Sequence, residues 1–328
     1  MEYRILGDSG LELSAITYGA FAIGGTMWGG NEKRESINAI QASIDNGVTS
    51  LDTAPFYGLG RSEELIGEAI KGRNRDKIQL LTKFGLVWDG STNGKGEFFF
   101  DAKDNGITYP VYKYAAKSNI IKEIEESLNR LGTDYIDLLQ IHWPDVTTPI
   151  DETMLALHEL IAQGKIRAAG VSNYSGDQVQ EASKTIKLAS NQVSYSMLNR
   201  AIEKDLVPYV IKNNIGIIAY SPMERGLLSG KYFKDAKLKE DDHRNGYFKQ
   251  FDTQKVKTFL ETIEPLATDK NATLSQLVLR WTTLQPGITV VLAGARNAVQ
   301  AIENARSMDI NLSDSELQFI NAELAKIN

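Results

Sequence analysis

The stretch 51–70, LDTAPFYGLGRSEELIGEAI, contains the end of a strand, a turn and the start of a helix. A short apolar run ends at Asp52, a Pro and a Gly break the chain around Tyr57, and a helical pattern begins at Arg61. A strand that leads through a polar turn into a helix is the unit from which parallel sheets are built. The stretch therefore predicts one βα unit, with a carboxylate and a phenol at the carboxyl end of its strand.

The same alternation of strand and helix continues along the chain. Short apolar runs predict strands at 15–19, 48–52, 78–82, 136–141, 166–171, 191–194, 215–219 and 288–292. Amphipathic stretches predict helices at 33–46, 62–70, 118–131, 152–163, 175–185, 203–212, 253–270, 298–306 and 313–326. The last of these helices begins with Ser313 and Glu316 in the spacing of a capping box.

Eight βα units in about 300 residues favour a (β/α)8 TIM barrel, an α/β fold, over an open doubly wound sheet. No Gly-x-Gly-x-x-Gly follows the first strand, which weakens the Rossmann alternative. An N-terminal β-hairpin turning at residues 8–10 precedes the barrel, and an extra C-terminal helix follows it. No linker-like segment divides the chain, so we expect one barrel domain over residues 1–328. Two connections are long: 84–117 is rich in aromatic residues, and 223–251 is rich in charge.

Composition limits the classes of function. The net charge of −6 argues against a nucleic-acid surface, so no nucleic-acid partner is expected. There is no Cys, and the three His (His142, His158 and His243) are far apart, so we expect no metal site. No apolar stretch approaches the ~20 residues that span a bilayer, and the N-terminal segment lacks a signal-peptide pattern. We therefore expect a cytoplasmic protein without a membrane partner.

A barrel gathers its chemistry at the carboxyl ends of the strands. Asp52 ends one predicted strand, Lys83 and His142 directly follow two others, and Tyr57 lies in the first turn after Asp52. A Lys ammonium lowers the pKa of a nearby phenol, and a carboxylate keeps that ammonium charged and oriented. A His beside the phenol can hydrogen-bond to a substrate oxygen. Such a set would protonate an oxygen while hydride reaches its carbon, and only a nicotinamide could supply that hydride.

Each of these residues also has an ordinary structural interpretation. Tyr57 alone would be a packing residue, Lys83 a solvated strand end and His142 a structural histidine. Because all three are expected at one rim of the barrel, a catalytic role is favoured over these structural interpretations. His158 and His243 keep the structural interpretation.

Several separated motifs, in the same order, resemble the aldo-keto reductase superfamily. They are LDTAPFYGLGRSEELIG, LLTKFG, DLLQIHWPD, KIRAAGVSNYS, NQVSYS, AYSPMERGLLSGKY and AGARNAVQAIENA. The resemblance extends over nearly the whole chain and is strongest to bacterial reductases and the potassium-channel β-subunit-like branch. It implies a catalytic tetrad of Asp52, Tyr57, Lys83 and His142, with Tyr57 as the general acid.

The resemblance also implies a site for an NADP(H) cofactor. Ser172, Asn173 and Gln192 would hold the nicotinamide carboxamide, and Tyr220 would stack on its ring. The remaining expected cofactor-binding residues are Ser221, Pro222, Met223, Gly226, Ser229, Lys231, Arg244, Gly294, Arg296, Gln300, Glu303 and Asn304. Residues 296, 300, 303 and 304 have the spacing of one helix face, whose N-terminal N–H groups would be free for an anion. Arg296 suits a 2′-phosphate, which favours NADP(H) over NAD(H), and no role follows for Glu224 or Arg225.

Four aromatic residues in the predicted βα loops are expected to line a substrate pocket, namely Trp28, Phe56, Trp88 and Trp143. The run 98–100 could belong to that pocket or pack a long loop onto the barrel. The expected activity is reduction of an aldehyde or ketone, and a sugar, a steroid or an aryl aldehyde suits the aromatic residues equally. The alternatives are a redox-sensing regulatory subunit that binds NADP(H) with little turnover, and a metal-dependent hydrolase or isomerase, which the scarcity of His disfavours. The oligomeric state is left open.

Overall fold

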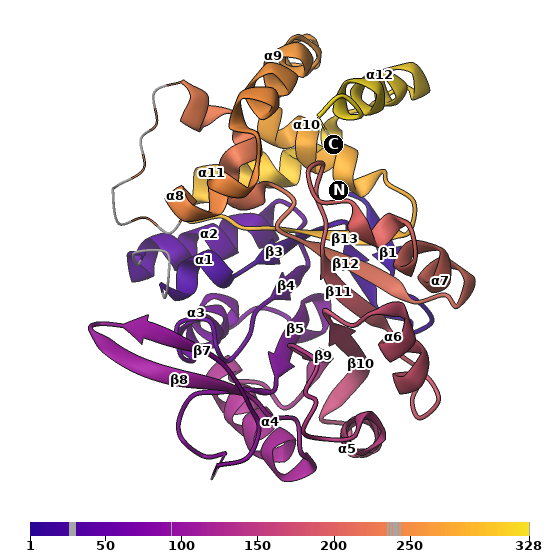
Figure 1. Cartoon of the computed structure of the whole chain (residues 1–328). Coiled ribbons are helices and arrows are strands. Elements are labelled where there is room, and N and C mark those ends of the chain that lie inside the picture. The colour runs from indigo at the N-terminus through magenta and orange to yellow at the C-terminus, as the bar shows by residue number, and fades with distance from the viewer. Residues whose placement is uncertain are drawn as a thin grey trace.

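The computed structural model describes residues 1–25, 31–92, 94–234, 236, 238, 242 and 244–327. In this part of the chain eight parallel strands close into a barrel in which consecutive strands are neighbours (Figure 1). The barrel strands are β3 (Ile16–Gly19), β4 (Ser50–Asp52), β5 (Gln79–Phe84), β9 (Ile136–Ile141), β10 (Ile166–Ser172), β11 (Ser190–Ser194), β12 (Gly216–Tyr220) and β13 (Ile288–Ala293). All eight predicted strands are confirmed, and so is the (β/α)8 barrel.

Helices surround the barrel and follow its strands (Figure 1). They are α1 (Phe21–Gly24), α2 (Lys33–Asp45), α3 (Arg61–Ile70), α4 (Lys117–Leu131), α5 (Ile150–Ala162), α6 (Gly176–Ala182), α7 (Leu206–Lys212), α8 (Arg244–Tyr247), α9 (Thr253–Asp269), α10 (Leu274–Thr283), α11 (Ala298–Arg306) and α12 (Asp314–Leu324). The capping box at the start of α12 is confirmed, because Ser313 and Glu316 exchange hydrogen bonds. Helix α10 was not predicted. Among the described residues, no helix has the length and apolar character needed to cross a membrane.

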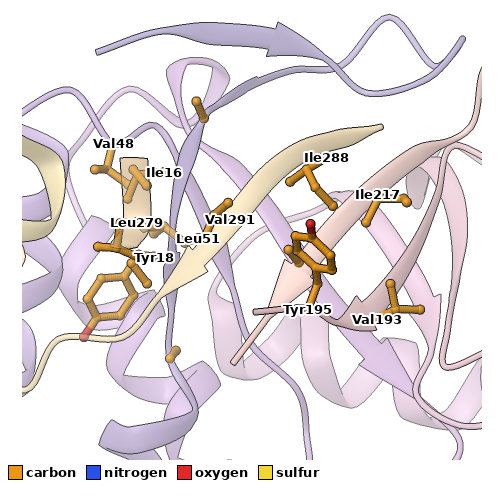
Figure 2. Close-up of a cluster of buried hydrophobic side chains, with 14 of the residues drawn as sticks. Ile16, Tyr18, Val48, Leu51, Val193, Tyr195, Ile217, Leu279, Ile288 and Val291 are labelled. Carbon is orange, nitrogen blue, oxygen red and sulfur yellow. The ribbon is translucent and has the colours of Figure 1, made fainter. Parts of the chain in front are cut away.

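Because side chains alternate between the two faces of each strand, the apolar residues form two layers, one outside the barrel and one inside it. Leu80 and Phe84 of β5 belong to the layer between strands and helices, whereas Leu81 lies in the smaller cluster inside the barrel. Figure 2 shows part of the outer layer, where Leu51 of β4 and Leu279 of α10 are buried together. Because successive side chains of a strand point to opposite faces, Lys83 shares the inner face with Leu81. Strand alternation thus directs this cation into the barrel.

The predicted N-terminal hairpin closes the opposite end of the barrel. Strand β1 (Tyr3–Ile5) pairs antiparallel with β2 (Glu12–Ser14). Leu6, Leu11 and Leu13 pack with inner residues of the barrel strands. A side chain at Gly7 would clash with the carbonyl oxygen of Ala189, which immediately precedes β11. The hairpin therefore covers the amino ends of the strands and leaves the carboxyl ends for the site.

The long connection 84–117, which the sequence predicts to be a loop, contains three strands. Strands β6 (Leu86–Val87), β7 (Glu97–Asp104) and β8 (Ile107–Lys113) form a small antiparallel sheet in the order β6-β8-β7. The long hairpin β7–β8 projects from the barrel (Figure 1). It turns at Asn105 and Gly106, both with positive φ, as a two-residue hairpin turn requires.

Candidate functional site

The carboxyl end of β4 and that of β5 bring together a buried ion pair. Lys83 Nζ lies 2.7 Å from Asp52 Oδ1, and both side chains are 1% exposed. The ammonium also donates to the carbonyl oxygen of Thr53 at 2.8 Å. Burial acts to lower the pKa of Lys83, but Asp52 and Tyr57 outweigh it, so the net effect raises this pKa. Lys83 is therefore a cation at neutral pH.

The second oxygen of Asp52 is bound from across the barrel. Gln192 Nε2 on β11 donates to Asp52 Oδ2 at 2.7 Å, and β11 stands opposite β4 in the ring of strands. Burial raises the pKa of Asp52, and Lys83 and Gln192 act against that rise. Both carboxylate oxygens are thus fixed, one by the cation and one by an amide.

Tyr57 lies in the turn between β4 and α3, next to this pair. Lys83 Nζ is 4.9 Å from the centroid of the Tyr57 ring. The turn packs closely on α1, since a Cβ added at Gly58 would lie 2.1 Å from the carbonyl oxygen of Gly24. Burial raises the pKa of Tyr57, although Lys83 acts to lower it. The expected net lowering by the ammonium is therefore wrong here, because burial outweighs it.

His142 follows β9 and faces the Tyr57 ring. The two ring centroids are 5.6 Å apart in an edge-to-face arrangement. The backbone of His142 is fixed twice: its N–H donates to the carbonyl oxygen of Phe84 at 2.9 Å, and its own carbonyl accepts from Asn173 at 3.1 Å. Burial, and then the charge of Lys83, hold the pKa of His142 well below 6.5. This imidazole is neutral at pH 7 and can donate or accept a hydrogen bond.

A second set of polar side chains lies on the same rim of the barrel. Ser172 Oγ donates to the carbonyl oxygen of Gln192 at 2.8 Å, and Tyr220 Oη donates to Asn173 Oδ1 at 2.9 Å. Asn173 has a positive φ of 62°, which Asn adopts more readily than most residues. Two amides and two hydroxyls on one rim offer both donors and acceptors, and this chemistry fits a carboxamide.

The chain after β12 forms tight turns rather than regular helix. Residues 224–229 are a 3-10 segment in which Arg225 and Gly226 have positive φ, and Ser221 before it also has positive φ. Within it, Ser229 Oγ donates to the carbonyl oxygen of Gly226 at 2.6 Å. Pro222 is buried, and Met223 packs on the core.

Lys231 and Arg244 are two of the three cations expected at the cofactor, and Arg296 is the third. Lys231 Nζ lies 4.9 Å from the centroid of the Tyr232 ring. Arg244 makes a two-point contact with Asp242, at 2.8 and 2.6 Å, and donates to Tyr232 Oη at 2.6 Å. Tyr232 therefore brings these two cations to one place.

Glu224 received no role from the sequence, yet it is fully buried. It accepts hydrogen bonds from Ser196 and from Tyr247 Oη, and Arg225 lies 3.9 Å above the Tyr247 ring. Residues 224 and 225 thus fix helix α8 to the turn after β12. No local pattern in the sequence distinguishes this Glu from an exposed one.

The residues expected at the adenosine end gather around the start of α11. The backbone N–H of Arg296 donates to Gln300 Oε1 at 2.9 Å, and Asn304 Nδ2 donates to the carbonyl oxygen of Gly294 at 3.0 Å. A Cβ at Gly294 would lie 3.4 Å from the carbonyl oxygen of Gly19, which is an ordinary van der Waals contact. Glu303 lies one turn along α11 from Gln300.

Two details of the expected adenosine end are wrong. Arg296 precedes the helix, which begins at Ala298, so it does not share a helix face with residues 300, 303 and 304. The first N–H groups of the helix are not all free either, because the side chain of Asn297 caps the N–H of Gln300.

The aromatic residues expected in a substrate pocket pack with the β7–β8 hairpin. Phe56, Trp88 and Trp143 belong to one cluster that also includes Phe99 and Phe100. Trp28 lies outside the described residues, as does His243. Phe99 and Phe100 thus pack with the residues expected to line the pocket, whereas Phe98 is exposed.

Comparisons with known proteins find relatives that match nearly the whole chain. Residues 15–324 match the model of the aldo/keto reductase family. The chain is 38% identical to the aldo-keto reductase YhdN of Bacillus subtilis, over 96% of this chain and 92% of that one. It is 36% identical to an NADH-specific methylglyoxal reductase of Escherichia coli, over 95% and 94% of the two chains.

A solved structure shows the same fold. The glycerol dehydrogenase AKR11B4 of Gluconobacter oxydans superposes with a TM-score of 0.86 at 35% identity, and the match covers 99% of this chain and 95% of that one. The chain therefore belongs to the aldo/keto reductase family, whose members are oxidoreductases that use a nicotinamide cofactor.

Proposed function

We propose that this protein is an NADPH-dependent reductase that converts an aldehyde or ketone to the alcohol, with Tyr57 as the proton donor. The observation that carries the proposal is the arrangement of Asp52, Lys83, Tyr57 and His142 at the carboxyl end of the barrel. A phenol whose ring lies close to a buried cation and to a neutral imidazole is suited to protonating an oxygen that gains negative charge.

Each side chain has a separate task in this mechanism. A nicotinamide cofactor, when bound, would supply the hydride. Tyr57 Oη donates its proton to the carbonyl oxygen, and the ammonium of Lys83 stabilises the resulting phenolate. Asp52 keeps Lys83 charged and oriented through the 2.7 Å contact. His142, neutral because of burial and Lys83, hydrogen-bonds to the same carbonyl oxygen and fixes its direction.

The cofactor would lie along the rim formed by β10, β11 and β12. Ser172, Asn173 and Gln192 would hold its carboxamide, and Tyr220 would stack on the ring. The turns at 221–231, with Arg244, would cover the pyrophosphate, and the residues around the start of α11 would hold the adenosine. Arg296 would bind the 2′-phosphate through its guanidinium, which is the reason for preferring NADPH.

Replacing Tyr57 by Phe tests the mechanism. With a reactive aldehyde, the purified protein should oxidise NADPH, and Tyr57→Phe should lower kcat by roughly 10²–10⁴-fold, the usual contribution of a positioned acid. The variant should still bind NADPH, because only one hydroxyl is lost. Absorbance at 340 nm follows turnover, and quenching of protein fluorescence follows binding. A variant that keeps the wild-type rate would refute the role of Tyr57.

The same assay tests which carbonyl compound is reduced and whether NADPH or NADH is the preferred cofactor. The panel contains methylglyoxal, an aryl aldehyde, a sugar and a steroid ketone, with glycerol in the oxidising direction, because relatives are named for methylglyoxal and glycerol. Each carbonyl is run with NADPH and with NADH. A clear preference for NADH, as in the Escherichia coli relative, would refute the assignment of Arg296. Tight NADPH binding without turnover on any carbonyl would instead favour the regulatory alternative.

A further inference from the structure

The β7–β8 hairpin carries three consecutive Phe residues that do not alternate regularly. Phe98 is paired with Tyr112 of β8 and Phe100 with Val111, so Phe99 is an extra residue in β7. Side chains alternate between faces in a regular strand, and a bulge interrupts this alternation. As a result Phe99 and Phe100 both pack in the aromatic cluster, whereas Phe98 is 53% exposed.

The rings of Phe99 and Phe100, both partly buried, contact the chain neighbours of Tyr57 and His142. The ring of Phe100 meets that of Phe56, which precedes Tyr57, with centroids 5.6 Å apart at 89°. The ring of Phe99 meets that of Trp143, which follows His142, with centroids 5.3 Å apart. Phe99 and Phe100 are themselves 5.0 Å apart.

These contacts form a continuous aromatic path between the two loops of the site. It runs from Phe56 through Phe100 and Phe99 to Trp143. Trp88 reinforces one end, with its ring 5.9 Å from that of Phe56. From β8, Lys113 Nζ lies 5.2 Å from the Phe99 ring. Aromatic pairs of this kind stabilise a structure beyond the burial of their surface, so the path resists displacement.

We propose that Phe99 and Phe100 are positioning residues for the proton transfer. They connect the turn that carries Tyr57 to the loop that carries His142, and so fix the distance between these two side chains. The inference rests on the proposed roles of Tyr57 and His142. Reaction rates depend steeply on such placement, since a shift of about 1 Å can lower a rate by about 10²-fold.

The chain offers a matched control for the test. Phe99→Leu and Phe100→Leu remove a ring from the path, whereas Phe98→Leu removes an identical ring from the exposed face of the same strand. We expect Phe99→Leu and Phe100→Leu each to lower kcat by about tenfold or more. KM for the aldehyde and the affinity for NADPH should change less than about threefold. Phe98→Leu should behave as wild type. Phe99→Tyr, which retains the ring, should restore most of the lost rate.

Three results would overturn the proposal. The first is equal kcat in all three leucine variants. The second is a rise in KM at constant kcat, which would make the rings substrate contacts. The third is a fall in kcat that only follows loss of folded protein, measured by thermal unfolding. Wild type and Tyr57→Phe are run in parallel: if wild type is inactive on every carbonyl, or Tyr57→Phe is fully active, the proposed function fails and not this inference alone.

Discussion

The ammonium of Lys83 contacts Asp52 in a place without solvent, so removing one partner leaves a buried charge unpaired. We expect Lys83→Met to lower the free energy of unfolding by about 3–5 kcal/mol at pH 7, measured by urea denaturation. The double variant Asp52→Asn/Lys83→Met should regain part of this loss, because both charges are then absent. The loss should become smaller as the pH falls, since burial raises the pKa of the unpaired carboxyl and its protonation removes the charge.

The same substitution at an exposed ion pair is the control. Lys117 Nζ lies 2.6 Å from Glu159, but both side chains are about half exposed. Lys117→Met should cost less than about 1 kcal/mol. If both variants lost the same stability, burial would not be what makes the Asp52–Lys83 pair important.

The sequence predicts where single site residues lie better than it predicts their pKa shifts or their burial. Asp52 and Lys83 end apolar runs, and strand ends meet at one rim in a barrel, so their proximity follows from the pattern. The net pKa shift of Tyr57 does not follow, because it depends on how the turn packs on α1. The burial of Glu224 depends in the same way on distant partners, Ser196 and Tyr247.

At the scale of elements, apolar runs predicted every barrel strand, because strands buried on both faces have a simple pattern. Helix α10 was missed although its apolar residues at 274, 277, 278 and 281 have the spacing of an amphipathic helix. A second signal was the capping box of Thr273 and Gln276. The β7–β8 hairpin was missed although Asn105-Gly106 is a strong turn signal. Its bulge and its contacts with the barrel have no such local signal.

A buried carboxyl lies where α4 meets the end of β5, and it should make the stability of the fold depend on pH. Glu123 is buried and accepts from the N–H of Gly85 at 3.0 Å and from Asn119 at 2.5 Å. Burial is the main cause that raises the pKa of Glu123 to about 8. The folded state therefore holds a proton that the unfolded chain releases near pH 4.5. This contribution to stability is complete below that pH and is lost as pH rises to about 8.

Glu123→Gln tests this dependence. The neutral amide keeps an acceptor for Gly85 but cannot ionise, so the variant should lose less stability than wild type between pH 5 and pH 8. The difference should be on the order of a few kcal/mol in urea denaturation. Glu125→Gln, on the exposed face of the same helix, should follow the wild-type curve. Parallel curves for Glu123→Gln and wild type would show that Glu123 is already ionised in the folded protein.

Across the whole molecule, the two ends of the barrel have different tasks. The carboxyl ends of the strands carry the polar site, and the amino ends are closed by the β1–β2 hairpin. Between them, the inner apolar cluster contains Leu81 and Leu138. Lys83 lies two residues beyond Leu81 along β5, on the same face of the strand, so the site lies next to this apolar layer. Stability and activity should therefore be separable by mutation at opposite ends.

Leu6→Ala tests that separation. Leu6 is fully buried under the barrel, where it packs with the inner apolar cluster. Its truncation should lower the free energy of unfolding by about 2–5 kcal/mol, because a cavity remains. At temperatures where the variant is folded, kcat and KM should match wild type, since the site lies at the other end. The adjacent Ile5 is 52% exposed, and Ile5→Ala should change stability by less than about 0.5 kcal/mol. A fall in kcat for folded Leu6→Ala would show that the closed end also controls the geometry of the site.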